Sequence, residues 1–121
     1  MTTIQPIILT ADLPRMLAFY RGLLDAEETV RQPPEGEPFY VGLRAGGAEF
    51  GLVNDEKAPA APGPVLLSLD VDDVRARLGR VARLGGTVLG PPNDMPWGQR
   101  VAHLQDPDGN AVNLTQPVPP A

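Results

Sequence analysis

Hydrophobic and polar positions follow nearly the same order in two stretches of the chain, residues 8–24 and residues 69–85. Each stretch begins with an apolar strand, continues with an aspartate that can cap a helix, and then places apolar residues at helical spacing. Asp12 in the first stretch corresponds to Asp73 in the second. The pattern predicts a duplicated unit, with a cleft between its two copies.

The first half is predicted to form a strand, a helix and three further strands. Pro14 falls in the first turn of the helix, where no N–H group is needed. Gly46 and Gly47 supply the turn of a hairpin. The predicted elements are a strand at 4–10, a helix at 13–24, a strand at 27–32, and hairpin strands at 39–47 and 48–54. The predicted apolar stripe of the helix consists of Leu13, Leu17, Tyr20 and Leu24.

Residues 55–64 are rich in proline and alanine, have no hydrophobic period, and are predicted to be a linker. The second half then repeats the pattern, with Gly85 and Gly86 ending the helix and a tight turn at 106–109. Its predicted elements are a strand at 65–71, a helix at 73–84, a strand at 87–89, a loop at 91–98, strands at 99–105 and 110–116, and an extended, poorly ordered tail at 117–121.

This order of elements predicts an α+β fold. Two tandem βαβββ modules would form a cupped mixed sheet with the helices on its outer face. Module 1 would span about residues 1–54 and module 2 about residues 65–116, within one domain of residues 1–121. The bare faces of the two sheets would then line a cleft, the kind of place where small-molecule sites occur.

Composition narrows the classes of function. The net charge of −5 argues against nucleic acid, which requires a basic surface. The chain has no cysteine, so disulfides, thiolate catalysis and cysteine-bound metals are excluded. No apolar run approaches the roughly 20 residues of a membrane span, and the N-terminus lacks the layout of a signal peptide. We therefore expect a cytoplasmic protein that binds neither nucleic acid nor membrane.

Three segments carry a resemblance to a known family: ADLPRMLAFYRGLL at 11–24, VDDVRARLGRVARLGG at 71–86, and WGQRVAHLQDPDGNAVNL at 97–114. In this order they resemble the vicinal oxygen chelate superfamily. That superfamily includes glyoxalase I, extradiol dioxygenases, fosfomycin-resistance transferases and bleomycin-resistance binding proteins. The resemblance implies the paired βαβββ fold, but members perform unrelated chemistry, so function must be argued from the site.

The resemblance also implies where metal ligands would lie. The family's metalloenzymes place them on the first and last strands of each module, and the matching positions here are Gln5, Gly51, Leu66 and Asn113. A divalent ion needs three or four donors, preferably carboxylate or imidazole. Two amides, a glycine and a leucine do not provide them, so we expect no metal and no other cofactor. A site built from His103 and Glu49 is the alternative.

Strand alternation indicates which side chains face the cleft. In relatives, the residue three before the turn aspartate points into the site, and here that residue is His103. Trp97 would either stack on a planar ligand or only plug the end of the sheet. His103 would be either a hydrogen-bonded wall residue or, in a metal-free enzyme, a base. The predicted ligand-binding residues are Trp97, His103, Phe39, Tyr40, Glu49, Met95, Ser68 and Asn113, with no catalytic residue assigned.

Other charged residues are given structural roles. Asp106 and Asp108 are predicted to stabilise the tight turn, and Arg100 to pair with a carboxylate that holds the preceding loop. The four arginines of the second helix are predicted to form a solvated face: Arg75, Arg77, Arg80 and Arg83.

These residues favour a metal-independent binding protein that sequesters a planar or aromatic drug or natural product, which resembles the bleomycin-resistance branch and antibiotic binding. One alternative is a metal-dependent lyase, isomerase or dioxygenase of the same superfamily, and another is a regulatory module with a vestigial cleft. We expect a homodimer, because such chains commonly pair and open sheet edges invite pairing. The modules could pack within one chain or swap between two.

Overall fold

The computed structural model describes residues 2–59 and 61–119. The chain separates into two compact units, unit 1 (Met1–Pro59) and unit 2 (Ala60–Ala121), and each has its own sheet. The α+β class is confirmed. Unit 1 has the predicted βαβββ order, and unit 2 has the same order with one additional short strand, β7. The grouping of both units into one domain, with a linker at 55–64, stays a prediction. Among the described residues, no helix is long and apolar enough to span a membrane.

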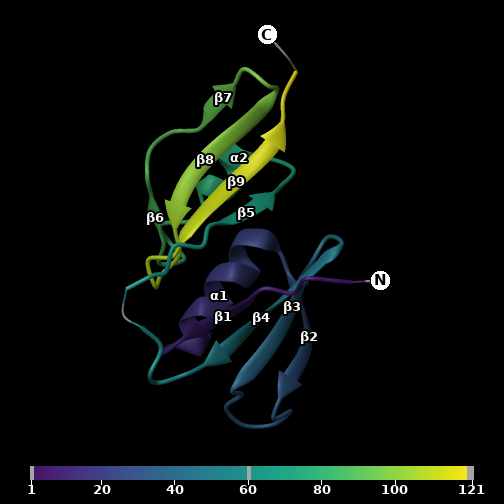
Figure 1. Ribbon diagram of the computed structural model, residues 1–121, viewed down its shortest axis with the longest axis vertical. Coiled ribbons are helices and arrows are strands. Elements are labelled where there is room, and N and C mark those ends of the chain that lie inside the picture. The colour runs from purple at the N-terminus through teal and green to yellow at the C-terminus, as the bar shows by residue number, and fades with distance from the viewer. Residues whose placement is uncertain (1, 60, 120–121) are drawn as a thin grey trace. The chain divides into compact units, whose positions relative to one another are not determined.

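Unit 1 contains sheet A, a four-stranded sheet with the order β1-β4-β3-β2 (Figure 1). Strand β1 runs parallel to β4, and the remaining neighbours are antiparallel. The Gly46-Gly47 hairpin turn is confirmed, because β3 and β4 pair up to Ala45 and Ala48. The elements are β1 (Ile7–Thr10), α1 (Leu13–Leu24), β2 (Glu27–Gln32), β3 (Tyr40–Ala45) and β4 (Ala48–Asn54).

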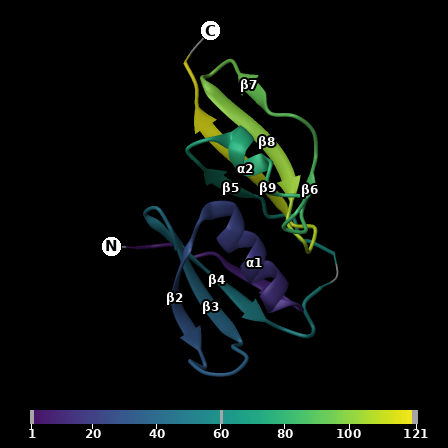
Figure 2. The same ribbon diagram turned by 180° about the vertical axis from the view of Figure 1, so that it is seen from behind.

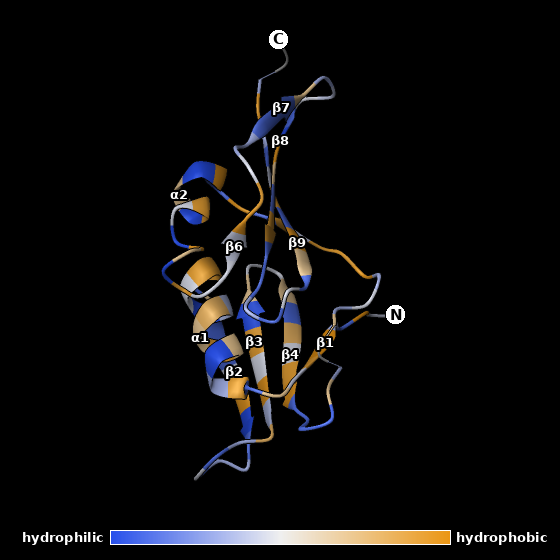
Figure 3. Cartoon of the chain, turned by 90° about the vertical axis from the view of Figure 1, so that its left-hand side faces the viewer, coloured by the Kyte–Doolittle hydropathy of each residue, from blue (hydrophilic) through white to orange (hydrophobic). Residues whose placement is uncertain are grey.

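Helix α1 covers one face of sheet A (Figure 3). Asp12 caps the helix by accepting a hydrogen bond from the Arg15 N–H group, as predicted. The predicted apolar stripe was partly wrong, since Leu17 and Leu24 are only half-buried. Each residue of a helix is rotated by about 100° from the one before it, and this places Leu17 and Leu24 on the flank of the helix, to one side of the buried row. The buried row consists of Leu13, Met16, Phe19, Tyr20 and Leu23.

Unit 2 contains sheet B, with the order β5-β9-β8-β6 and with β7 also paired to β8 (Figure 2). Strand β5 runs parallel to β9, as β1 does to β4 in unit 1. The duplicated pattern of the sequence therefore corresponds to a duplicated topology. The elements are β5 (Leu67–Asp70), α2 (Val74–Leu78), β6 (Thr87–Val88), β7 (Asn93–Met95), β8 (Gln99–Gln105) and β9 (Ala111–Pro117).

Four predictions for unit 2 were wrong in whole or in part. The helix predicted at 73–84 ends at Leu78, where Gly79 is the C-cap and hydrogen-bonded turns continue to Gly85. The loop predicted at 91–98 contains strand β7. Arg77 does not belong to a solvated face, because its side chain is 15% exposed and pairs with Asp72 at 3.3 Å. Of the predicted tail, Pro117 belongs to β9, and residues 120–121 lie outside the described residues.

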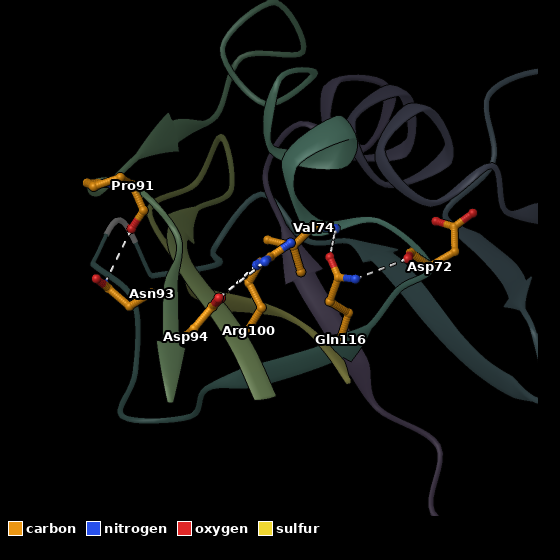
Figure 4. Close-up of polar contacts among 7 residues, drawn as sticks. All are labelled: Asp72, Val74, Pro91, Asn93, Asp94, Arg100 and Gln116. Carbon is orange, nitrogen blue, oxygen red and sulfur yellow. Dashed lines mark hydrogen bonds and ion pairs between the residues drawn. The ribbon is translucent and has the colours of Figure 1, made fainter. Parts of the chain in front are cut away.

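Polar contacts hold the start of α2 and the β7–β8 hairpin (Figure 4). The side-chain oxygen of Gln116 accepts a hydrogen bond of 2.8 Å from the Val74 N–H group, and Asp73 accepts one from Ala76. The guanidinium of Arg100 donates to Asp94 at 2.7 Å, which confirms the predicted pairing of Arg100 with a carboxylate. This pair joins β7 to β8 and thereby fixes the loop that carries Trp97.

Candidate functional site

Sheet A has one face packed under α1 and one open face. Val41, Leu43 and Leu52 are buried, and the Phe50 ring contacts Tyr20 of α1 at 5.5 Å between ring centroids. Residues one position away along the same strands therefore point to the opposite side. This open face of sheet A keeps large apolar side chains exposed, with Ile7 at 47%, Leu9 at 48% and Val30 at 38%.

The Tyr40 ring lies on the open face of sheet A, over two glycines. A Cβ atom at Gly51 would lie 2.6 Å from Cε1 of Tyr40, and one at Gly42 would lie 3.5 Å from its hydroxyl oxygen. Gly42 and Gly51 face each other in the β3–β4 ladder, so their missing side chains make room for the Tyr40 ring and its neighbours. Ile7 lies 2.9 Å from the Cβ position of Gly51, and Val30 and the Thr29 hydroxyl lie 2.9 and 2.8 Å from that of Gly42.

A hydrogen bond holds the Tyr40 side chain in place. The amide nitrogen of Gln5 donates to the Tyr40 hydroxyl oxygen at 3.1 Å. The resemblance matched Gln5 and Gly51 to metal-ligand positions, and here the Tyr40 ring lies over Gly51 and accepts a hydrogen bond from Gln5. Gly42 was not singled out from the sequence, although a glycine inside a strand is a known sign of close approach by another group.

The other predicted site residues of unit 1 are less closely grouped. Glu49 forms an exposed ion pair with Arg44 at 2.6 Å, so its carboxylate already has a partner. Phe39 is 60% exposed and precedes β3, so alternation directs it away from the face that Tyr40 occupies. The structure therefore brings Tyr40 and Gln5 together, and it does not bring Phe39 beside them.

Sheet B has its own open face, on the side opposite α2. Leu67, Leu69, Ala102, Leu104, Val112 and Leu114 are buried or half-buried on the α2 side. Ser68, Asn113 and His103 lie in register across β5, β9 and β8, on the other side of the sheet. The Nδ1 atom of His103 lies 2.6 Å from the side-chain oxygen of Asn113. The predicted grouping of these three residues on one face is thus present within unit 2.

Trp97 lies in the turn between β7 and β8 and is 71% exposed. Its indole N–H group donates to the Gln99 side chain at 3.0 Å, and Gln99 shares a strand face with His103. An indole with this exposure does not plug the end of the sheet. Met95 is half-buried and pairs with Gln99 at the other side of the same turn. The Arg100 side chain, by its hydrogen bond, lowers the pKa of Asp94 and keeps this hairpin ion pair charged.

Asp106 has the predicted role in the tight turn. It is 2% exposed, and its carboxylate accepts hydrogen bonds from the backbone N–H groups of Asp108 and Asn110 and from the Asn110 amide. A buried carboxylate with three donors is satisfied by the turn itself. The Asp106 carboxylate therefore serves the turn and is not assigned to ligand binding.

The donors present do not fit a resident metal ion. Within residues 2–59 and 61–119, no three His, Asp or Glu side chains gather into a group that could hold a metal. The positions matched to metal ligands are Gln5, Gly51, Leu66 and Asn113, which supply two neutral amide oxygens. The oxygen of Asn113 already accepts from His103. Divalent ions prefer carboxylate and imidazole donors, and this set offers neither.

Two hollows lie on the helix sides of the units, away from the predicted site residues. One, of about 610 Å³, lies between the start of α1 and the loop after β2, beside Leu17 and Pro38. The other, of about 340 Å³, lies between α2 and β6, beside Leu78 and Val88. None of the predicted ligand-binding residues lines either hollow.

The sequence profile of the Glyoxalase/Bleomycin resistance protein/Dioxygenase superfamily matches residues 3–114, and the chain belongs to this family. The resemblance found in the three sequence segments is thereby confirmed. The match covers both units, so the duplicated βαβββ topology is the family fold.

Individual relatives differ in how much of their length is matched. "Putative glyoxylase CFP32" of Mycobacterium bovis is 32% identical over 112 residues, which cover 92% of this chain and 42% of that protein. The chain thus spans less than half the length of this curated relative. TioX from Micromonospora sp. ML1 has a TM-score of 0.77 at 19% identity, with 99% of both chains covered. The fosfomycin resistance protein FosX from Mesorhizobium loti has a TM-score of 0.72 at 20% identity, with 95% of this chain and 91% of that chain covered.

Proposed function

We propose that this chain is a metal-independent binding protein that sequesters a planar or aromatic small molecule, such as a drug or natural product. The observation that carries the proposal is the open face of sheet A. There a tyrosine ring lies over two glycines, and exposed Ile7 and Val30 flank it. A flat ligand can cover such a surface without displacing any side chain, and burial of apolar area stabilises the complex by about 25 cal/mol per Å².

The charged and basic groups near these faces are already engaged, which favours binding over catalysis. Glu49 is paired with Arg44, and His103 is hydrogen-bonded to Asn113 rather than to an acid or a nucleophile. A general base needs a substrate proton within reach and a group that orients it. A sequestering protein needs only affinity, so neutral polar groups and aromatic rings are sufficient.

The indole of Trp97 is the second aromatic surface that we propose contacts a planar ligand. Its indole is largely exposed, and its N–H group is held by Gln99, so the ring is oriented without being buried. Oriented aromatic side chains stack on planar ligands at low conformational cost. The family description includes bleomycin resistance proteins, and the neighbour FosX is named a fosfomycin resistance protein, which supports a resistance role of the same kind.

The proposal includes a homodimer in the cytoplasm. The strands with one neighbour each are β1 and β2 in sheet A and β5, β6 and β7 in sheet B. A second copy that pairs with such an edge would extend the sheet. Sedimentation equilibrium tests the assembly, and a monomer at all concentrations would contradict this part of the proposal. Cell fractionation tests the location.

The binding role is tested with proflavine, a planar aromatic cation suited to an acidic protein. We expect saturable shifts in the ¹⁵N-¹H spectrum at Gly42 and Gly51, together with quenching of Trp97 fluorescence. Trp97→Ala should weaken binding by about 1 kcal/mol or more if the indole contacts the ligand. Val88→Ala is the matched control, because Val88 is also exposed but lies on the α2 side of unit 2. Absence of saturable binding by proflavine and by neutral planar probes would overturn the proposal.

A metal assay separates this function from the alternative of a metal-dependent lyase, isomerase or dioxygenase. Freshly purified protein is analysed for Ni, Zn, Mn and Fe, before and after these ions are added back. We expect less than stoichiometric metal and unchanged proflavine affinity in the presence of a chelator. One tightly bound ion per chain would favour the enzyme instead.

A further inference from the structure

We propose that the Tyr40 hydroxyl is the hydrogen-bond donor that selects planar ligands bearing a carbonyl oxygen. This inference rests on the proposed function, since it names the chemical class of ligand for the open face of sheet A. Its basis is the geometry of Tyr40, Gln5 and the two glycines beneath the ring.

The direction of the hydrogen bond between Gln5 and Tyr40 leaves a donor free. The Gln5 amide nitrogen can only donate, so at 3.1 Å the Tyr40 oxygen is the acceptor. A phenol also carries one proton of its own, and that proton has no acceptor among the described residues. The O–H group can therefore donate to a group that arrives from solvent.

Contacts around the Tyr40 ring restrict the directions in which its O–H group can point. Tyr40 contacts the Gly42 and Gly51 positions from above, and the Ile7 side chain closes the space over Gly51. The Gln5 amide holds the oxygen from one side. A ligand that stacks on this surface therefore meets the O–H group in a restricted set of directions.

A carbonyl is the partner that these surroundings favour. The large side chains around the ring, Ile7, Leu9 and Val30, are apolar. The Thr29 hydroxyl is a second donor nearby, but it lies on the Gly42 side, 2.8 Å from the Cβ position of that glycine. The guanidinium of Arg44 is paired with Glu49, so it is not available to an anionic ligand. A planar ligand that covers Tyr40 without an acceptor would bury the O–H group unpaired, whereas a ligand with a carbonyl would satisfy it.

The test uses two neutral probes of nearly the same shape, 9-fluorenone and fluorene, which differ by a carbonyl in place of a methylene. Affinities are measured from amide shifts of Gly42 and Gly51 in ¹⁵N-¹H spectra of the full chain. We expect the wild type to bind fluorenone about tenfold more tightly than fluorene. Tyr40→Phe keeps the ring but should bring the two affinities to within about twofold, through weaker binding of fluorenone.

Tyr20→Phe is the matched control, because it removes the hydroxyl of the other tyrosine, which is buried under sheet A. It should retain the preference for fluorenone. Equal binding of both probes by the wild type, or an unchanged preference in Tyr40→Phe, would overturn this inference and leave the proposed function standing. Failure of the wild type to bind either probe or proflavine would overturn both.

Discussion

The imidazole of His103 and the side-chain amide of Asn113 are joined by a hydrogen bond of 2.6 Å on the open face of sheet B. The two residues are direct partners in the β8–β9 ladder, so the backbone register brings the side chains together. The amide oxygen can only accept, and Nδ1 must therefore carry the ring proton. The lone pair of Nε2 is then left as an acceptor for a ligand or for water.

This relationship predicts the tautomer of neutral His103. Long-range ¹⁵N-¹H spectra should show the Nδ1–H form as the major species in the wild type. Asn113→Ala removes the acceptor and should shift the population toward the Nε2–H form. Ser68→Ala, a change at the neighbouring strand position on the same face, is the control and should leave the tautomer unchanged. A wild-type spectrum dominated by Nε2–H would contradict the hydrogen bond.

The second prediction concerns the glycine beneath Tyr40. In Gly51→Ala, the new methyl group would lie 2.6 Å from the Tyr40 ring and 2.9 Å from Ile7, so both side chains must shift. We expect a stability loss of about 1 kcal/mol, because side-chain ends can move. The larger effect should be loss of the Gln5–Tyr40 hydrogen bond and at least a fivefold weaker affinity for fluorenone, about 1 kcal/mol.

Gly47→Ala provides the control for this substitution. Gly47 lies in the β3–β4 turn, and a Cβ there would meet nothing within 4 Å. Its affinity and stability should stay close to those of the wild type. Aromatic ring shifts of Tyr40 measured by NMR report whether the ring has moved. An unmoved ring in Gly51→Ala would show that the close packing over Gly51 is absent in solution.

Much of the fold follows from hydrophobic period and turn chemistry. The strand bounds predicted at 27–32 and 99–105 match β2 and β8, because turn-forming residues flank both segments. The face shared by Ser68, His103 and Asn113 follows from alternation once the resemblance to relatives sets which residues of 99–105 face the site. Strand β7 could not be predicted in this way. It has three residues, lies between prolines, and depends on the pairing of Asp94 with Arg100 across the hairpin.

The position of Tyr40 shows where prediction from sequence ends. Strand alternation places Tyr40 on the open face, but only the side-chain rotamer decides whether the ring stands up or lies over the sheet. The sequence contains one indication that the ring packs against the sheet, namely a glycine inside each of two neighbouring strands. That these glycines are direct partners is known only from the register of β3 and β4. The metal positions could be tested from residue types, because the donor chemistry does not depend on a rotamer.

The third prediction concerns Asp106, whose buried carboxylate accepts two backbone N–H groups and the Asn110 amide. Asp106→Ala should lower the free energy of unfolding by about 3 kcal/mol, because the donors lose a charged acceptor. Glu35→Ala, in the exposed loop after β2, is the control and should change it by less than about 0.5 kcal/mol. Urea denaturation measures both, and equal effects would refute the role of Asp106 in the turn.

The last prediction uses the ion pair between Glu28 and Arg31, whose side-chain atoms are 2.6 Å apart. The hydrogen bond from Arg31, assisted by the nearby charges of Arg31 and Arg21, lowers the pKa of Glu28 in the folded state. A carboxyl with a lowered folded-state pKa contributes stability above its unfolded pKa, and the contribution is lost as pH falls through the folded value. Glu28→Gln should therefore lower the free energy of unfolding by about 1 kcal/mol at pH 7, and the difference from the wild type should shrink below about pH 4.5.

Urea denaturation at several pH values measures this difference in the free energy of unfolding between Glu28→Gln and the wild type. Glu27→Gln, which removes the neighbouring exposed carboxylate, corrects for the change in net charge. A difference that stays constant from pH 7 to pH 3 would show that the ion pair does not stabilise the folded chain.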